Sequence, residues 1–297
     1  MADKIQRFSF AQLPIRGEIV SLDTSIQTIC DQHQYPNEVR HLLAEALAAC
    51  ALIADIIKID GSVSLQIQSP SLIKLMLVEI DHQGHIRGLL QTNPELDDQL
   101  NNESFNFAKW VANGQMAITI NPDKGQRYQG VVPLDKATLA ECLEDYFNLS
   151  EQLPTHIKIF ANADRAFGIF VQTLPQEASS SIGNEQISQA FEHVTALTQT
   201  IKFEEAFELE HQELLYRLFH QDEVSIYPEK AIRFQCSCSR ERNMDALTTI
   251  EPSELMDIIE QQGEIEMVCD FCSNAETFNR QQILDLLTAN AEQGLVN

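Results

Sequence analysis

The chain has 297 residues, which predicts about two domains at roughly 150 residues per domain. Its hydrophobic content of 44% is enough to form cores and excludes a disordered or fibrous chain. Twenty Lys and Arg stand against 44 Asp and Glu, and the formal net charge of −24 argues against nucleic acid and anionic membrane surfaces as partners.

The chain shows no sign of export or of membrane insertion. No stretch reaches the ~18 to 20 apolar residues of a membrane helix, and the first residues, MADKIQRFSFAQLPIRGE, lack the apolar segment of a secretion signal. We therefore expect a cytoplasmic protein with no membrane partner. Seven cysteines, an odd count, then indicate thiol or metal chemistry and not a secreted disulfide framework.

The first 174 residues mix strand-like and helix-like segments. Alternating apolar residues or apolar runs predict strands at 62–69, 72–91 (a hairpin turning at 82–84), 116–120, 157–159 and 167–171. Apolar residues at helical spacing predict helices over 37–58 and 137–150. Because the two kinds of segment do not alternate strictly, we predict an α+β fold and not a doubly wound parallel sheet.

Composition changes at Pro175, where the short polar segment PQEASSSIGNEQ predicts a domain boundary. Two apolar helical stripes follow, too few to make a domain alone, so they must pack on another part of the chain. These stripes carry Ile187, Phe191, Val194, Leu197, Leu214, Leu218 and Phe219. We predict an N-terminal α+β domain over 1–174, a helical linker over 175–230 and a small module over 231–297.

Four cysteines form two close pairs in that last module. Cys236 and Cys238 are separated by one residue, and Cys269 and Cys272 follow after thirty intervening residues. Two such pairs on tight turns suit a tetrahedral four-cysteine site, for which zinc is the preferred metal, although an iron–sulfur cluster uses the same ligands. Four thiolates leave no open position for water, so catalysis at the metal is disfavoured.

The residues around the cluster and the remaining cysteines are less specific. Arg240 and Arg242 directly follow the first pair and would favour thiolate over thiol, although a plain surface role is equally compatible with their positions. Cys30, Cys50 and Cys142 lie on apolar helix faces and are predicted to be core residues. Common enzyme motifs are missing from the sequence, which predicts a protein that is not an enzyme.

The cysteine pairs and their neighbours resemble the C-terminal zinc centre of the redox-regulated heat-shock protein 33 family, the 33 kDa chaperonin. The likeness extends over essentially the whole chain. Its landmarks are CSCSRER at 236–242, VCDFC at 268–272, IRGE at 15–18, GQRYQGV at 125–131, CLEDYF at 142–147, SEQLP at 150–154 and VSIY at 224–227. One departure is Ser273-Asn274, where the family often has Gly-Asn; we expect little effect, because Asn tolerates left-handed turns.

The resemblance implies an ATP-independent holdase that is inactive while reduced and bound to one zinc ion. It further implies that oxidants form the disulfides Cys236–Cys238 and Cys269–Cys272 and release the zinc. The module and the linker would then unfold, and the apolar stripes would bind unfolding client proteins. Oxidised members of the family form homodimers.

Three other functions compete with that interpretation. One is a non-redox zinc-ribbon adaptor that recruits a folded partner. Another is a thiol–disulfide oxidoreductase using Cys269 and Cys272, although we expect no second strand after 264–268 to complete a redox βαβ unit. Nucleic-acid binding is the weakest, because residues 231–297 hold four Arg and no Lys against twelve acidic residues.

Overall fold

The computed structural model describes residues 2–99, 105–175 and 183–294. Its internal contacts divide the chain into two units, Met1–Gln235 and Cys236–Asn297. The polar segment that predicts a boundary at Pro175 falls mainly on residues 176–182, which lie outside the described residues. The division into domain, linker and module therefore stays a prediction. Within the described ranges, no helix is both long and apolar enough to cross a membrane.

The first unit holds two six-stranded sheets. Sheet A has the antiparallel order β10 (Val224–Ile226), β1 (Lys4–Phe10), β2 (Ile15–Leu22), β9 (Ala166–Thr173) and β8 (Thr155–Ala161), with β11 (Lys230–Ala231) also on β1. Sheet B has the order β12 (Arg233–Phe234), β5 (His85–Thr92), β4 (Ile73–Asp81), β3 (Gly61–Gln68), β6 (Gln115–Pro122) and β7 (Tyr128–Pro133). Only β12 runs parallel to its neighbour among these described strands.

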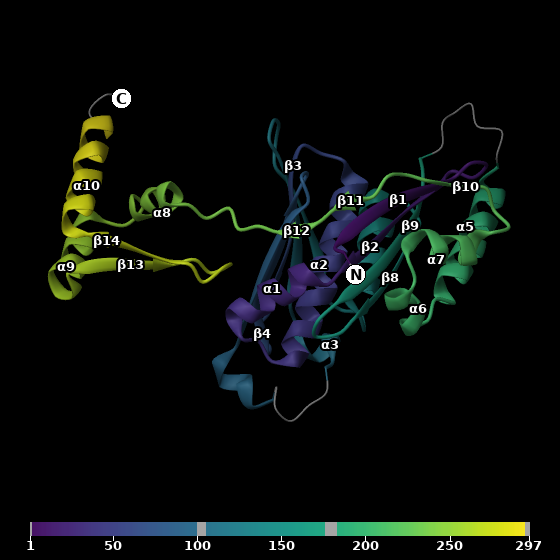
Figure 1. Ribbon diagram of the computed structural model, residues 1–297, viewed down its shortest axis with the longest axis horizontal. Helices are drawn as coiled ribbons and strands as arrows, with labels where there is room; N and C mark the ends of the chain where they lie inside the picture. The colour runs from purple at the N-terminus through teal and green to yellow at the C-terminus, as the bar shows by residue number, and fades with distance from the viewer. Residues whose placement is uncertain (1, 100–104, 176–182, 295–297) are drawn as a thin grey trace. The chain divides into compact units, whose positions relative to one another are not determined.

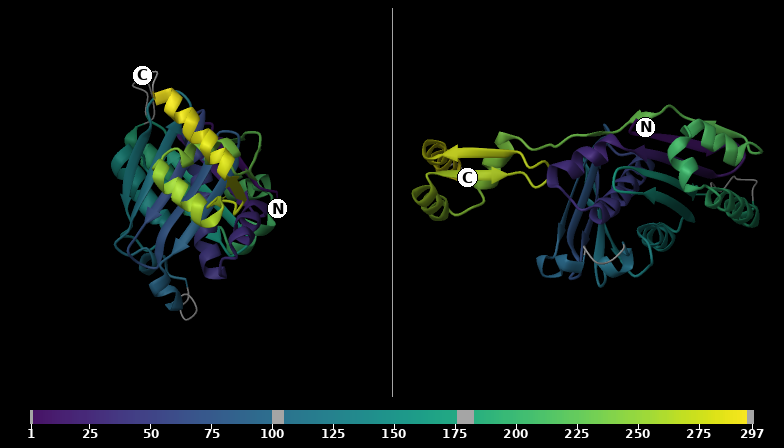
Figure 2. Two further views of the ribbon diagram at one scale, coloured as in Figure 1. Left: turned by 90° about the vertical axis from the view of Figure 1, so that its left-hand side faces the viewer. Right: turned by 60° about the horizontal axis from the view of Figure 1, so that its bottom comes forward.

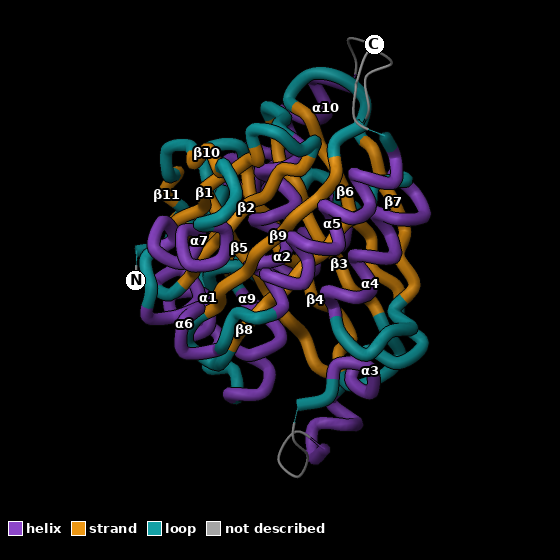
Figure 3. Tube along the Cα trace, turned by 90° about the vertical axis from the view of Figure 1, so that its right-hand side faces the viewer, coloured by secondary structure: helices purple, strands orange, loops and turns teal. Residues whose placement is uncertain are grey.

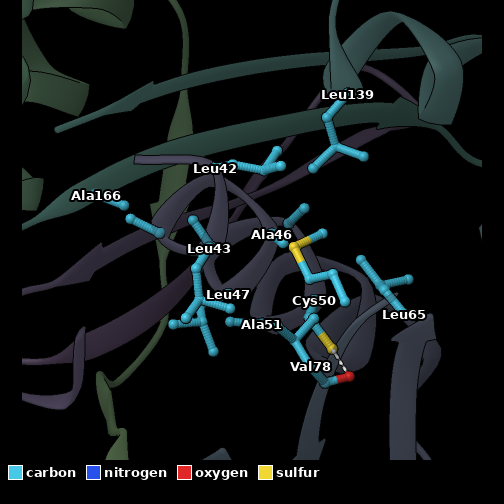
Figure 4. Packing of buried hydrophobic residues seen from close by; sticks show 14 of the residues in the cluster. Leu42, Leu43, Ala46, Leu47, Cys50, Ala51, Leu65, Val78, Leu139 and Ala166 are labelled. Carbon is cyan, nitrogen blue, oxygen red and sulfur yellow. Dashed lines mark hydrogen bonds between the residues drawn. The ribbon is translucent and has the colours of Figure 1, made fainter. Parts of the chain in front are cut away.

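Helix α2 (Asn37–Ile57) lies between the two sheets (Figure 1) and contacts strands of both. It is apolar nearly all round, as a helix covered on every side must be, and its many alanines allow close approach of the sheets. Leu42, Leu43 and Leu47 pack in this core beside Cys50, whose Sγ donates a weak hydrogen bond to the carbonyl of Val78 (Figure 4). The remaining helices of this part are α1 (Thr24–His33), the 3-10 helix η1 (Pro94–Gln99), α3 (Phe107–Trp110), α4 (Leu139–Tyr146) and the π-helical turn η2 (Phe147–Glu151).

A second layer of helices covers the other face of sheet A (Figure 3): α5 (Asn184–Gln199), α6 (Phe203–Glu208) and α7 (His211–Phe219). Phe219 of α7 packs against Phe8 and Phe10 of β1, with ring centroids 5.8 and 5.0 Å away. The Phe8 ring lies over Gly17, where a Cβ would come within 2.1 Å of it. Glycine in the IRGE landmark therefore makes room for a ring on which the linker helices pack.

After α7 the chain returns across both sheets through β10, β11 and β12. Ile232, between β11 and β12, is buried in the main core with 4% exposure. Lys4 donates hydrogen bonds to Glu210 at 2.6 Å and to Glu229 at 2.8 Å, so one lysine of β1 holds two points of the linker. The linker is thus attached through strands and ion pairs as well as helices.

The second unit is a hairpin with three helices. Its elements are α8 (Arg240–Leu247), α9 (Pro252–Gln262), β13 (Glu264–Val268), β14 (Ala275–Asn279) and α10 (Arg280–Gly294). The hairpin and α10 are the yellow segments of Figure 2. Six buried apolar residues form its core among those described: Leu247, Leu255, Ile259, Ile265, Phe278 and Ile283. The core is small for independent stability.

The α+β prediction is confirmed, and the strands and the hairpin expected from alternation are β3, β4–β5, β6, β8 and β9. The helix expected over 137–150 ends as an α-helix at Tyr146, and its last turn widens into η2. A second strand does follow 264–268, but, as expected, it does not complete a βαβ unit. Strand β14 pairs with β13, but antiparallel, so the pair forms a hairpin and not a βαβ unit.

Candidate metal centre

Cys269 and Cys272 lie on the tight loop that joins β13 to β14. The loop is closed by the Ser273 N–H, which donates to the Cys269 carbonyl at 2.8 Å, and by the Cys269 N–H, which donates to the Asn274 carbonyl at 3.0 Å. The left-handed residue is Ser273, with φ of 54°. From the sequence, we expected Asn274 to take the left-handed conformation. A serine therefore occupies a backbone conformation that glycine adopts without strain.

Cys236 and Cys238 lie on an extended segment that leads into α8. The Ser239 hydroxyl caps this helix by accepting from the Arg242 N–H, and the Arg242 guanidinium donates to the carbonyl and hydroxyl of Ser237 at 2.9 and 2.6 Å. A cap and a side chain that folds back onto the same loop fix the position of the first cysteine pair.

Arg240 connects α8 to the hairpin that carries the second pair. Its guanidinium donates to Glu276 at 3.3 Å and to the Thr277 carbonyl at 3.2 Å, and it lies over the Phe278 ring at 4.4 Å. These contacts give Arg240, like Arg242, a structural role. Tuning of the thiols by either arginine stays a prediction.

The four cysteines converge into one cluster. All four Sγ atoms lie within 4.8 Å of one another, with 3.6 Å between Cys236 and Cys269 and 3.4 Å between Cys238 and Cys272. A tetrahedral site with Zn–S bonds of about 2.3 Å separates its sulfurs by roughly 3.7 Å. The cluster can therefore hold a metal ion with tetrahedral coordination.

The protonation chemistry of the cluster also suits a cation. Burial opposes ionisation of Cys236, but the N–H of Cys238 and the neighbouring thiols lower the pKa of the Cys236 thiol. Burial and then the neighbouring sulfurs raise the pKa of Cys238. Burial also raises the pKa of Cys272, and the Asn274 N–H only partly offsets this effect. A cation among the four sulfurs would favour the thiolate form of the cluster.

The other cysteines lie away from any such cluster. Cys30, Cys50 and Cys142 are buried, and burial raises the pKa of all three, that of Cys30 to about 11. The sequence prediction of core residues agrees with these positions. The predicted client-binding residues lie on α5 and α7, where Ile187, Val194, Leu214, Leu218 and Phe219 are buried and Phe191 and Leu197 half-buried.

The residues that hold the linker in place are not among those predicted from the sequence. Lys4 and His211 are both almost fully buried, and the His211 ring contacts the Ser21 hydroxyl through Nε2 at 2.8 Å. In the sequence, Lys4 and His211 stand next to apolar residues, which is only a weak indication that they are buried. Their partners lie about 190 residues or more away in the sequence, which local spacing does not reveal.

The fold and the cluster together define an α+β protein that carries a four-cysteine site able to hold a metal ion. The family model described as Hsp33 protein matches residues 3–279. The chain belongs to the Hsp33 family.

Relatives and a solved structure agree with this assignment. The 33 kDa chaperonin of Shewanella sediminis is 41% identical over 277 residues, which cover 93% of each chain. That of Shewanella oneidensis is 40% identical over 284 residues, 96% of this chain and 95% of the relative. The crystal structure of the 33 kDa chaperonin of Thermotoga maritima has a TM-score of 0.80 at 20% identity, covering 97% of this chain and 99% of that one, and supports the fold.

Membership makes the chain an Hsp33-type chaperone. The family is a chaperone family and not a class of enzymes, and its members bind unfolded client proteins. The oxidoreductase and adaptor interpretations therefore give way to a chaperone.

Proposed function

We propose that this chaperone is a redox-regulated, ATP-independent holdase of the cytoplasm. In the reduced, inactive state one zinc ion is bound by Cys236, Cys238, Cys269 and Cys272. Oxidation forms the disulfides Cys236–Cys238 and Cys269–Cys272, zinc leaves, and the module and linker unfold. The chain then binds unfolding proteins, as a homodimer, and engages neither nucleic acid nor membranes.

The observation that carries the proposal is the distance between the sulfurs. At 3.4 and 3.6 Å they fit a thiolate–metal tetrahedron, whereas a disulfide needs about 2.05 Å. Metal binding and disulfide formation therefore exclude each other. Oxidation of either pair must remove metal ligands.

Loss of the metal would be enough to unfold the second unit. Structural zinc contributes roughly 10–16 kcal/mol to small modules, whereas a whole domain is stable by only about 5–15 kcal/mol. The described core of this unit has six buried apolar residues, so little would remain to hold its shape.

Unfolding that reaches the linker would expose the surface that clients need. Val194, Leu214 and Phe219 are buried against sheet A while the linker is docked. Undocking would release both these faces and the Phe8–Phe10 surface beneath them, a large apolar patch of the kind that binds unfolded chains. The net charge of −24 would keep such a chain in solution.

The pairing of the disulfides is the one that the resemblance to the Hsp33 family implies. The sulfur contacts at 3.6 and 3.4 Å, Cys236–Cys269 and Cys238–Cys272, cross between the two motifs. Cysteines of one motif are two or three residues apart, so each bond would form within its own motif once the zinc has left. Peptide mapping of the oxidised chain tests this; cross-motif bonds would refute the pairing.

The central experiment measures zinc content, free thiols and suppression of client aggregation before and after mild oxidation. We expect loss of one zinc and four thiols together with a gain of activity. Cys142→Ala, outside the cluster, serves as the matched control and should behave like wild type. Oxidation that releases zinc and thiols without any gain of activity would contradict the redox switch.

A ligand substitution separates metal loss from disulfide formation. Serine oxygen replaces soft thiolate poorly, so Cys269→Ser should bind zinc weakly and be partly active in reducing buffer at elevated temperature. We would compare reduced Cys269→Ser with reduced wild type on a thermally unfolding client. A zinc-free variant that is no more active than wild type would show that unfolding through metal loss is not the switch.

A further inference from the structure

A cavity of about 310 Å³ lies within the first unit, at the C-terminal end of α2. Three parts of the fold enclose it: the last turn of α2, the hairpin turn between β4 and β5, and β11 of the linker. The volume is at the lower end of the roughly 300–1,000 Å³ that is typical of small-molecule sites, so a compact ligand would fill it. The inner wall is apolar and includes Ile5, Ala54, Val63, Ile80 and Ile232.

Exposed hydrogen-bond donors line this apolar space. Lys58, which ends α2, lines the cavity, and within the described ranges no carboxylate forms an ion pair with it. His82 is exposed on the hairpin turn, and its Nδ1 accepts from the Gly61 N–H at 3.2 Å, so the neutral ring carries its proton on Nε2. Lys230 of β11 has three N–H bonds and one described acceptor, the Asp55 carboxylate. Two cations and one imidazole N–H therefore have hydrogen bonds to spare.

The carboxylates of the cavity wall are already engaged. Asp55 accepts from Arg7 at 3.1 Å and from Lys230. Asp81 accepts from the His85 ring at 2.8 Å and from two N–H groups of the hairpin turn. Arg7 also donates to the Asp55 carbonyl, which offsets the negative end of α2. An anion that enters the cavity therefore meets spare donors and no unpaired carboxylate of the wall.

The cavity is complete only while the linker is docked. Lys230, Ala231 and Ile232 form one wall, whereas the other walls belong to β1, α2 and the strands of sheet B. The Ile232 N–H donates to the Asp3 carbonyl at 2.9 Å and fixes that wall in place. A ligand in the cavity touches both parts, so it binds the docked state in preference to the undocked one and shifts the equilibrium toward docking.

We propose that this cavity binds a small organic anion, with a phosphate or carboxylate head and a compact apolar body, and that the bound anion stabilises the docked linker. The head accepts hydrogen bonds from Lys58, Lys230 and His82, and the body packs against the apolar inner wall. Inhibition of activation by such a ligand rests on the proposed function, in which the linker must undock; binding at the cavity does not.

The test of binding uses isothermal titration of the reduced, zinc-loaded full chain. Phenyl phosphate and benzoate combine a ring with an anionic head, phenol has the ring without the charge, and inorganic phosphate has the head alone. A hydrogen bond to a charged group corresponds to about tenfold or more in affinity, so the better aryl anion should bind at least about tenfold more tightly than phenol. The two aryl anions distinguish a phosphate from a carboxylate site. Phenol that binds as tightly as both anions, or no binding of either anion, would overturn the proposal.

Variants then locate the site. Lys58→Gln should lower the affinity for the aryl anion about tenfold. Lys124→Gln, which removes an exposed lysine from the turn between β6 and β7, is the matched control and should bind like wild type. Ala54→Leu fills the cavity without changing its charges and should weaken the aryl anion and phenol alike. Unchanged binding of the aryl anion in folded Lys58→Gln or Ala54→Leu would place the ligand elsewhere, and so would equal affinities of phenyl phosphate and inorganic phosphate.

Hydrogen exchange of the Ile232 amide tests the effect on the linker. If only the docked state binds, the aryl anion at 100 times its Kd should slow exchange through undocking by about 100-fold. The measurement is made on reduced protein and needs no oxidation, so it can fail or succeed independently of the redox switch. Unchanged exchange in the presence of saturating ligand would refute the stabilisation of the docked linker.

Discussion

Acidification should loosen the docked linker through His211, the first residue of α7. Its ring is 1% exposed, and burial, with Lys4 nearby, lowers its pKa from 6.5 to about 3. The docked state therefore excludes a proton that the undocked histidine takes up below pH 6.5, so docking weakens as the pH falls. One pKa unit corresponds to about 1.36 kcal/mol, and because the undocked histidine is already half protonated at pH 6.5, lowering the pH from 6.5 to 5 should cost about 1.6 kcal/mol.

The assay is hydrogen exchange of the α7 amides in the reduced protein at several pH values, corrected for the intrinsic exchange rate. His211→Gln keeps a hydrogen-bonding group for Ser21 but cannot titrate, so the difference between the two proteins removes effects of pH on the cysteine cluster. His193→Gln, an exposed histidine of α5, is the control and should keep the wild-type slope. If wild type and His211→Gln lose protection equally between pH 6.5 and 5, the reasoning is refuted.

Three further predictions concern single side chains. Phe219→Ala should lower the free energy of linker docking by about 3–5 kcal/mol and give chaperone activity in reducing buffer. Tyr216 is 72% exposed on the same helix, so Tyr216→Ala should have neither effect. Equal activities of the two variants would contradict this. Ser273→Gly should stabilise the zinc-bound module by about 1 kcal/mol, because glycine adopts the left-handed conformation without strain, and slower zinc loss to a chelator would confirm it. Glu18→Gln should stabilise the first unit by about 1–3 kcal/mol at pH 8, and by less at pH 5, as measured by urea unfolding. The reason is that the folded state holds the proton of Glu18 up to a pKa of about 8, whereas the unfolded chain releases it near pH 4.5. A larger gain at pH 5 than at pH 8 would contradict this reasoning.

The sequence predicted those parts of the fold that repeat locally. Helix α2 and the β4–β5 hairpin were predictable because periodicity and turn residues lie within one short segment, and the cysteine cluster because its two motifs are short and rare. Attachment of the linker was not predictable in this way. Ile232 enters the core next to residues far away in the chain, and β12 has only two residues, too few to show a pattern.

The sequence predicted which residues form the candidate metal site, but not the backbone conformation and side-chain contacts around them. Four ligand candidates came from spacing alone, but which residue of the Cys269 loop takes the left-handed conformation depends on backbone geometry. The contacts of Arg240 were likewise not predictable from the sequence, since its partner Glu276 lies on the distant hairpin, and sequence alone does not show that Arg242 folds back onto Ser237.

In the redox cycle that we propose, the burial of the three interior cysteines limits which disulfides can form. Thiol–disulfide exchange requires a thiolate that can reach the disulfide. Cys30, Cys50 and Cys142 have raised pKa values and lie in the core of the first unit, so they neither attack a disulfide formed in the cluster nor accept one from it. If the proposed redox switch operates, and as long as that core stays folded, oxidation and reduction would involve the four cluster sulfurs and leave these three thiols unchanged.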